Sequence, residues 1–314
     1  MSRTVDILMA TYNGENFVEE QIKSILNQTY KNFNLIIRDD CSTDRTVEII
    51  KKIMKNDKRI KLYQNEANLG YVKNFEKLCQ DSSSSLIAFS DQDDVWMKEK
   101  VEKLVSFMEK TKSILVFCDM KVTDANLNVI NESFQKFNGK KSKCLKYNDF
   151  YLLKLENVIS GCSMMFDRSI LSNAYPFPCK SVIHDWWLAL LATQYGKVSF
   201  LNESLQYYRQ HDKNSIGVRK NKYKTFEDYR AKILNEKFYL YNLLYENRNS
   251  FKKNEADIFD GYNYFFKVLN RKNSFFNAIK VFKIYNTETN SRKFKMFLLF
   301  NLPFIGKIMY NIKY

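Results

Sequence analysis

The feature that most constrains the fold is an alternation of short apolar segments with amphipathic ones over roughly the first 120 residues. Glu15–Asn27, Arg45–Met54 and Met97–Glu109 have apolar residues at helical spacing. The apolar segments between them have the length of strands: Val5–Ala10, Asn34–Arg38, Ile60–Gln64, Ser85–Phe89 and Ile114–Asp119. Strands separated by helices pair in parallel through right-handed crossovers. The alternation therefore predicts an α/β fold with a mostly parallel central sheet flanked by helices.

Polar side chains follow three of these strand-like segments. Thr11–Asn13 follows the first segment, Asp39–Asp40 the second and Asp91–Asp94 the fourth. In open parallel sheets, ligands bind beyond the carboxyl ends of the strands. We therefore expect these three groups to line one site.

The densest of these groups has three carboxylates, Asp91, Asp93 and Asp94, within four residues. Clustered carboxylates repel one another unless a cation lies between them, and Mg²⁺ commonly bridges such groups to substrate phosphates. The alternative is an acidic loop that caps the helix beginning near Trp96, although a cap needs only one acid. For Asp39–Asp40, a turn with a helix cap is an equal alternative to a nucleoside contact.

Two downstream motifs add candidates for chemistry. Asp185 lies at the start of a predicted helix next to Trp186 and Trp187, where it is suited to act as a general base. Gly161 and Cys162 offer a place where backbone can approach a substrate closely, because glycine has no Cβ. The alternatives are a helix cap with core tryptophans, and a glycine that serves strand packing.

The charge balance narrows the choice of partner. The formal net charge of +15 calls for an anionic partner, which nucleic acid, nucleotide phosphates or an anionic lipid surface can provide. Residues 261–314 contain ten Lys or Arg, one acid and 14 aromatic residues. Residues 291–314 suit short helices lying on an anionic membrane, or ordinary helices packed on the protein. The apolar stretch Met296–Gly306 is too short to span a bilayer.

The cysteines and the N-terminus bear on the compartment. Six scattered cysteines include no C-x-x-C pair, which argues against a zinc site and a disulfide framework. The N-terminal segment lacks the apolar core of a signal peptide. We therefore expect a cytoplasmic protein that is attached peripherally to the inner face of the cell membrane.

Three motifs, in this order and spacing, resemble those of the family 2 inverting glycosyltransferases: Ala10-Thr-Tyr-Asn-Gly, Asp39-Asp-Cys-Ser-Thr-Asp and Asp91-Gln-Asp-Asp. The resemblance covers about residues 4–216 and implies a GT-A fold, with a Rossmann-like sheet. Ser90 to Trp96, with the two downstream motifs, is similar to bacterial rhamnosyltransferases of cell-surface polysaccharide synthesis. The chain departs from the family at Cys41, which is usually Gly, and at His184, which is often Glu.

The resemblance implies a role for each matching residue. Asp40 is expected to contact the nucleobase, and Asp185 to be the general base. Asp91 and Asp93 are expected to handle the ribose and the pyrophosphate with its metal. A divalent cation, Mg²⁺ or Mn²⁺, is expected at Asp93, with Asp91 and His211 as further candidate ligands. The other donor-binding candidates are Thr11, Tyr12, Asn13, Asp39, Gln92 and Arg209, and the acceptor-binding candidates are Gly161, Cys162, Trp186 and Trp187.

Together these observations predict a two-part enzyme. A catalytic domain over residues 1–216 precedes a basic, aromatic-rich helical extension over residues 217–314. The enzyme is expected to transfer a sugar from a nucleotide-sugar donor to a saccharide or lipid-linked saccharide acceptor. Rhamnose is the first candidate, and glucose, galactose and N-acetylhexosamine stay open.

Three other classes of protein fit less well. A basic nucleic-acid-binding protein has no need for the Asp91–Asp94 cluster, which repels phosphate, so no nucleic-acid partner is expected. A sugar-nucleotide pyrophosphorylase would want a Gly-rich, basic loop after the first strand, and Thr11–Gly14 is not one. A non-catalytic saccharide-binding module has no use for a metal.

Overall fold

The computed structural model describes residues 3–137, 157, 159–178, 183–212, 214, 225–251 and 263. The chain divides into two compact units. The first comprises Met1–Asn148, Val158–Cys179 and Ile183–Val218, and the second comprises Asp149–Asn157, Lys180–Val182 and Arg219–Tyr314. The domain boundary between residues 216 and 217 stays a prediction.

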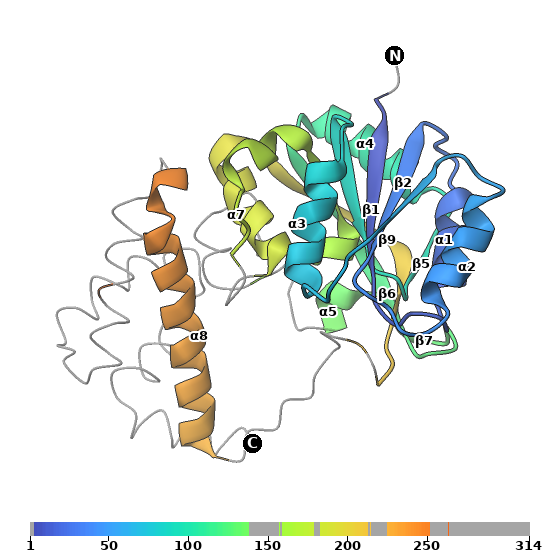
Figure 1. The fold of residues 1–314 in the computed structure, drawn as a ribbon. Helices are drawn as coiled ribbons and strands as arrows, with labels where there is room; N and C mark the ends of the chain where they lie inside the picture. Colours follow the sequence, from blue (N-terminus) through green and yellow to red (C-terminus); the bar gives the residue numbers. More distant parts are fainter. Residues whose placement is uncertain are drawn as a thin grey trace. The chain divides into compact units, whose positions relative to one another are not determined.

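The first half of the sheet in the first unit is parallel, with strand order β3-β2-β1-β4 (Figure 1). Its strands are β1 (Val5–Thr11), β2 (Phe33–Asp39), β3 (Ile60–Gln64) and β4 (Leu86–Ser90). Thr11 pairs with Asp39, and Met9 pairs with Ser90. The three polar groups predicted to line a site therefore leave the sheet at the same edge.

The second half of the sheet is mixed. Strand β8 (Met164–Asp167) lies antiparallel between β4 and β6 (Leu115–Thr123). Strand β9 (Val198–Arg209) runs parallel to β6. Two short strands, β5 (Val95–Trp96) and β7 (Val129–Asn131), pair antiparallel with β9 and β6. The predicted α/β fold is confirmed, with β8 as the element that interrupts the parallel order.

The amphipathic segments form helices on both faces of this sheet. The helices are α1 (Val18–Leu26), α2 (Thr46–Met54), α3 (Tyr71–Asp81), α4 (Lys100–Thr111), α5 (Phe134–Phe137) and α7 (His184–Tyr195). Ile22 of α1 and Leu104 of α4 are buried in one core with Ile7 of β1. Phe75 of α3 packs against Phe89 of β4, with ring centroids 4.8 Å apart. Because alternate strand residues point to opposite faces, these two sets cover opposite sides of the sheet.

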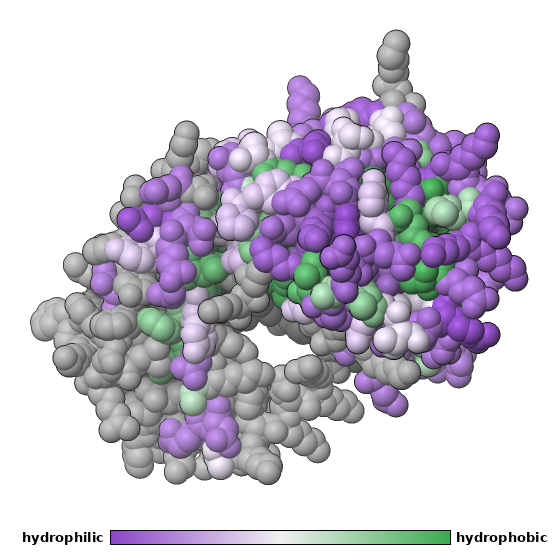
Figure 2. All heavy atoms as spheres, in the orientation of Figure 1, coloured by the Kyte–Doolittle hydropathy of each residue, from purple (hydrophilic) through white to green (hydrophobic). Residues whose placement is uncertain are grey.

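Two short 3₁₀ segments flank β8. They are η1 (Gly161–Ser163) before the strand and η2 (Arg168–Asn173) after it. The strand itself therefore begins at Met164, and Gly161 lies before it in η1. On the face drawn in Figure 2, hydrophilic side chains predominate over the first unit and hydrophobic ones show in small separate areas.

The second unit contains helix α8 (Phe226–Glu246), followed by η3 (Arg248–Ser250). Thr225 begins α8, and its hydroxyl accepts a hydrogen bond from Asp228 N (3.1 Å). Within the described ranges, no helix combines the length and the apolar character needed to cross a bilayer. The interfacial helices predicted over residues 291–314 lie outside the described residues.

Candidate active site

The loop after β1 is fastened to the loop after β4 by the Gln92 amide. This amide accepts a hydrogen bond from Tyr12 N (2.9 Å) and donates one to Tyr12 O (2.9 Å). A Cβ at Gly14 would lie 2.2 Å from Gln92 Oε1, so a side chain at position 14 would displace this amide from its two bonds to Tyr12. Asn13, with a φ of 47°, donates from its backbone N to Ser42 Oγ (2.9 Å). The predicted donor-binding loops are thus in direct contact.

Asp39, at the end of β2, is buried and hydrogen-bonded to its own loop. Its Oδ1 accepts from Thr11 Oγ1 (2.9 Å) and Ser42 Oγ (2.6 Å), and its Oδ2 accepts from Ser42 N (2.8 Å). The structure thus brings Thr11 and Asp39 together as expected. It also gives Asp39 a role in closing the turn.

Asp40 is also buried and holds the loop that leads into α3. Its Oδ1 accepts from Asn65 Nδ2 (2.8 Å) and Leu69 N (2.8 Å), and its Oδ2 accepts from Gly70 N (2.9 Å). A carboxylate has about four acceptor sites, so little capacity is left for a nucleobase. The turn interpretation of this pair is therefore well supported by its contacts.

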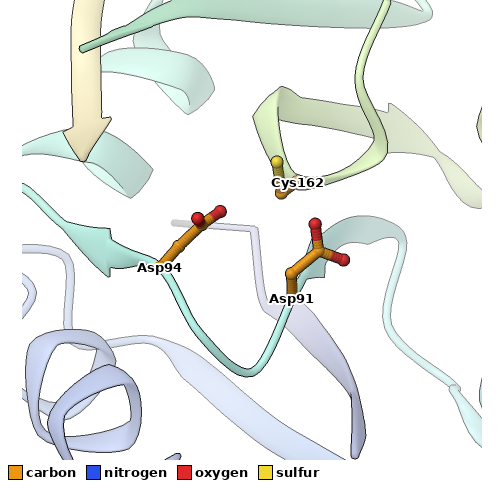
Figure 3. Close-up of side chains that lie close together, drawn as sticks. All are labelled: Asp91, Asp94 and Cys162. Atoms are coloured by element: carbon orange, nitrogen blue, oxygen red, sulfur yellow. The ribbon is translucent and has the colours of Figure 1, made fainter. Parts of the chain in front are cut away.

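The carboxylates of Asp91 and Asp94 come together with the thiol of Cys162 (Figure 3). One carboxylate oxygen of each Asp and the Cys162 Sγ all lie within 4.8 Å of one another. Burial, with the neighbouring Asp93 charge, raises the pKa of Asp91 to about 7 and raises the pKa of Asp94 well above its usual range. The negative charge of this group is therefore costly in its buried setting.

Asp93 belongs to a different set of contacts. Its Oδ2 lies 2.9 Å from His211 Nε2 and accepts a hydrogen bond from Asn214 Nδ2 (3.1 Å). The His211 ring stacks on Phe17, with centroids 4.5 Å apart. The structure thus joins Asp93 to His211 as expected. Among the residues it describes, however, Asp91 groups with Asp94 and Cys162 rather than with this pair.

Arg209, a predicted donor-binding residue, is buried and its guanidinium contacts protein groups. Nε donates to Asp93 O (2.7 Å), Nη1 donates to Ala125 O (2.5 Å), and the group forms an ion pair with Glu20. The Arg209 backbone N donates to Asp94 Oδ1 (3.2 Å). In this structure Arg209 thus holds the acidic loop in place, and its predicted contact with the donor stays a prediction.

Asp185, the predicted general base, begins α7 and is buried against η1. Its Oδ2 accepts a hydrogen bond from Gly161 N (2.8 Å), and its Oδ1 accepts from Trp186 N (2.5 Å). A Cβ at Gly161 would lie 3.1 Å from His184 Nε2 and 3.5 Å from Asp185 Oδ2. Glycine therefore allows this close approach, and the next residue, Cys162, faces the acidic group of Figure 3.

His184 is buried in an aromatic setting. Its ring stacks on Phe75, with centroids 4.1 Å apart, and meets Phe89 and Tyr71 at steeper angles. Neither ring nitrogen has a hydrogen-bond partner in the described part of the chain. Burial lowers the pKa of His184 to about 3, so the ring stays neutral at physiological pH.

The two tryptophans predicted to bind the acceptor lie in different surroundings. Trp187 is 1% exposed, and its Nε1 donates to Ala174 O (2.8 Å). Trp187 therefore packs in the core, and its predicted contact with the acceptor stays a prediction. Trp186 is half-buried beside Asp185 and keeps that possibility.

Sequence reasoning missed Lys100, a buried lysine at the start of α4. Its Nζ donates to Cys162 O (2.6 Å), and burial lowers its pKa. The signal was present in the predicted helix. Lys100 occupies the same helical face as Leu104 and Met108, four and eight residues further on, which is the face that points inward.

The donor set at this edge fits a divalent cation. Carboxylate oxygens are the ligands that Mg²⁺ and Mn²⁺ prefer. Asp91, Asp93 and Asp94 bring three such groups, and burial together with their mutual repulsion raises the pKa of Asp91 and of Asp94. Burial also raises the pKa of the Cys162 thiol, so this sulfur stays protonated.

Comparison with known proteins agrees with this picture. The sequence model of the family described as glycosyl transferase family 2 matches residues 6–174 of this chain. An uncharacterized glycosyltransferase of Methanocaldococcus jannaschii is 29% identical over 98% of this chain and 93% of its own length. The dTDP-rhamnosyl transferase RfbG of Shigella flexneri is 29% identical over 69% of this chain and 77% of its own. The Escherichia coli UDP-Glc:alpha-D-GlcNAc-diphosphoundecaprenol beta-1,3-glucosyltransferase WfgD is 31% identical over 63% and 73%.

Solved structures share the fold at lower sequence identity. S. aureus TarS 1–349, in complex with UDP-GlcNAc, has a TM-score of 0.58 and 18% identity over 95% of this chain and 81% of its own. The Pyrobaculum calidifontis mannosyltransferase PcManGT, in complex with GDP-Man and Mn²⁺, has a TM-score of 0.57 and 13% identity over 99% and 88%. With the match over residues 6–174, the strand-end acids and this shared fold show that the chain is a glycosyltransferase that belongs to glycosyl transferase family 2.

Proposed function

We propose that this enzyme transfers a sugar from a nucleotide-sugar donor to a saccharide or lipid-linked saccharide acceptor in surface polysaccharide synthesis, with inversion of the anomeric carbon. One observation carries the proposal. Residues 161 and 162 connect two acidic centres, which are Asp185 and the Asp91–Asp94 loop. Gly161 N donates to Asp185, and the Cys162 thiol faces Asp91 and Asp94. A donor at the acidic loop and an acceptor at Asp185 are thereby neighbours.

Each acid has a task in this proposal. Asp185 accepts the proton of the attacking acceptor hydroxyl, a contribution of typically about 10²–10⁴-fold to the rate. Its two backbone hydrogen bonds, from Gly161 N and Trp186 N, fix the direction of its oxygens. Asp93 and Asp91 are the proposed ligands of a divalent cation, with His211 holding the Asp93 carboxylate. When bound, the cation offsets the negative charge that develops on the leaving diphosphate.

The donor-binding surface is proposed at the shared loop edge. Tyr12 is 47% exposed there, and Asn13, Gln92, Thr11 and the Asp39–Asp40 turn shape the backbone around it. The aromatic ring of Tyr12 suits a nucleobase or ribose face. Gly161, Cys162 and Trp186 form the proposed acceptor side.

The donor sugar is proposed from the relatives. The motifs around Asp91 and Asp185 favour rhamnose, and RfbG is a dTDP-rhamnosyl transferase. WfgD is a glucosyltransferase of similar identity, so glucose is the second candidate. The WfgD name also describes a diphosphoundecaprenol-linked acceptor, which supports a lipid-linked saccharide here.

A donor panel tests the proposal. The purified full chain and a diphosphoundecaprenol-linked saccharide acceptor are incubated with dTDP-rhamnose, UDP-glucose, UDP-galactose or UDP-N-acetylglucosamine. Each donor is tested with Mn²⁺, Mg²⁺ or EDTA, and the released nucleoside diphosphate is measured. We expect release from one donor, with dTDP-rhamnose first, only when a divalent cation is present. Equal release in EDTA would contradict the cation, and no release from any donor would contradict the donor class.

Peripheral attachment to an anionic membrane surface at the cytoplasmic face is a separate proposal. It is supported by the basic, aromatic composition of residues 291–314, which contain five Lys or Arg and no acid. Truncation after Asn290 is expected to release the protein from vesicles of phosphatidylglycerol, and high salt is expected to weaken binding of the full chain. Binding that survives truncation would assign the attachment elsewhere.

A further inference from the structure

A buried lysine lies beneath the two acidic centres. Lys100 is 1% exposed, and its ammonium meets three partners. Nζ donates to Cys162 O (2.6 Å) and to Gln206 Oε1, and it lies 3.6 Å from the centroid of the Trp96 ring. Two carbonyl oxygens and one aromatic face account for the three N–H donors of a lysine ammonium.

The hydrogen bonds of Lys100 form two arms, and the first of them leads to the acidic Asp91–Asp94 loop. The Gln206 amide, on β9, accepts from Lys100 through Oε1 and donates through Nε2 to Asp94 Oδ2 (2.9 Å). Both Gln206 and Asp94 are fully buried, so no solvent competes for these bonds. Buried bonds of this kind fix geometry strongly, because an unpaired buried group is costly.

The other arm leads to the proposed general base. Lys100 binds the carbonyl of Cys162 within the three-residue η1. The preceding residue, Gly161, donates its backbone N–H to Asp185 Oδ2. A shift of η1 therefore moves the donor that orients Asp185. The same shift moves the Cys162 thiol away from Asp91 and Asp94.

We propose that Lys100 is the positioning residue that ties the donor-side acidic loop to the acceptor-side general base. The two arms meet at its ammonium group, one through Gln206 and the other through Cys162 O. Lys100 touches neither donor nor acceptor. It acts on the donor side through Asp94, which belongs to the same loop as the proposed cation ligands Asp91 and Asp93, and on the acceptor side through Asp185. This inference rests on the proposed function for the roles of that loop and of Asp185.

The first experiment needs no activity. Lys100→Met is compared with the full wild-type chain and with Lys103→Met, which changes an exposed lysine on the same helix that pairs with an exposed Glu203. Native protein is alkylated with iodoacetamide, and modification of each cysteine is followed by peptide mapping. Cys162 is buried, and Cys79 is a buried cysteine on α3 that serves as the internal control.

We expect Cys162 to react at least about 10-fold faster in Lys100→Met, with Cys79 unchanged, because a local opening of η1 exposes only the first of them. Lys103→Met is expected to match wild type. Protection of Cys162 in Lys100→Met, or equal exposure of both cysteines, overturns the proposal. The alkylation result does not depend on enzyme activity. If no donor of the panel is consumed, that result contradicts the proposed function and leaves the positional role of Lys100 to be decided by the alkylation rates.

The second experiment is a kinetic double-mutant cycle with the donor that the panel identifies. Lys100→Met is expected to lower kcat by about 30-fold with donor KM within about threefold of wild type. In an Asp185→Asn background, the same change should lower the residual rate by less than about threefold, because the oriented group is already gone. An equal loss in both backgrounds indicates a merely structural role and overturns the proposal.

If the Lys100→Met protein does not fold, a second variant tests the same link. Gln206→Met removes the acceptor for Lys100 and the donor for Asp94 while leaving the lysine in place. It is expected to lower kcat by about 10-fold or more at unchanged donor KM. Wild-type kcat in Gln206→Met would overturn the link between the two centres.

Discussion

Two strand ends, one on either side of β1, have the same acidic residues and opposite surroundings. At the end of β2, Asp39 and Asp40 each accept three hydrogen bonds from nearby loop groups. At the end of β4, Asp91 faces the Cys162 thiol and the Asp94 carboxylate, and burial with the nearby Asp93 charge raises its pKa to about 7. A carboxylate whose acceptor sites are filled by N–H and O–H donors stabilises its loop. A carboxylate left among other acids needs a cation, and that need is what a catalytic site can use.

The largest loss of activity is expected at Asp93, a proposed ligand of the cation. Asp93→Asn should lower sugar transfer by about 10³-fold, since electrostatic stabilisation of a leaving diphosphate is worth several kcal/mol. Steady-state rates and a thermal melt of the same preparation measure this. A melting temperature near wild type shows that the fold is kept. EDTA should reproduce the loss in the wild-type enzyme, and added Mn²⁺ should reverse it.

The next largest loss of activity is expected at Asp185, the proposed general base. Asp185→Asn should lower transfer by about 10²-fold, because an amide cannot take the proton of the acceptor hydroxyl. Binding of nucleoside diphosphate with Mn²⁺, measured by calorimetry, should stay near wild type. A parallel loss of binding would indicate instead that Asp185 only supports the start of α7.

The β2 end should respond through stability rather than through metal binding. Asp40→Ala leaves the N–H groups of Asn65, Leu69 and Gly70 without their buried acceptor, at a cost of about 3 kcal/mol in the free energy of unfolding. Urea unfolding measures the change. Asp91→Asn is the matched variant, and it should unfold at the wild-type urea concentration or above it. The comparison breaks down if the two variants are equally destabilised.

The smallest effect concerns pH without any divalent cation. The pKa of Asp91 is raised from 3.8 to about 7 by burial and by Asp93, so the native state binds more protons than the unfolded state between about pH 4 and pH 7. Stability contributed by this group therefore falls as pH rises through that window. In EDTA, the melting temperature should be a few degrees lower at pH 8 than at pH 5.5. Asp91→Asn should reduce this difference, and Mn²⁺ should reduce it in wild type.

The first half of the sheet could be read from local pattern alone. Segments such as Ile60–Gln64 and Arg45–Met54 match β3 and α2 within one residue, because each segment is short, regular and buried on one face. The second half depends on pairing between distant segments. No local pattern indicates that β8 inserts antiparallel between β4 and β6, or that the long β9 lies beside β6.

The sequence predicted where the candidate site lies, but it predicted the contacts of the individual side chains less well. The strand-end rule located the acids, since their position follows from strand direction. What each side chain contacts depends on distant residues. Arg209, a donor-binding candidate, is bound to Glu20 and to the Asp93 carbonyl, and Trp187, an acceptor-binding candidate, packs in the core. Neither contact is visible in the local sequence. Lys100 was overlooked because a lysine on a helix is usually taken as solvated.

The contact between Gly14 and Gln92 has a consequence for how sequences of this kind can change. With Gln92 in place, any side chain at position 14 begins 2.2 Å from the amide oxygen, so mutation of Gly14 has to displace the Gln92 amide. A shorter residue at position 92 removes the obstacle but also releases both backbone bonds of Tyr12. Positions 14 and 92 are therefore coupled, because a side chain at the first competes with the glutamine at the second for the same space. A library that varies both positions together samples this coupling directly.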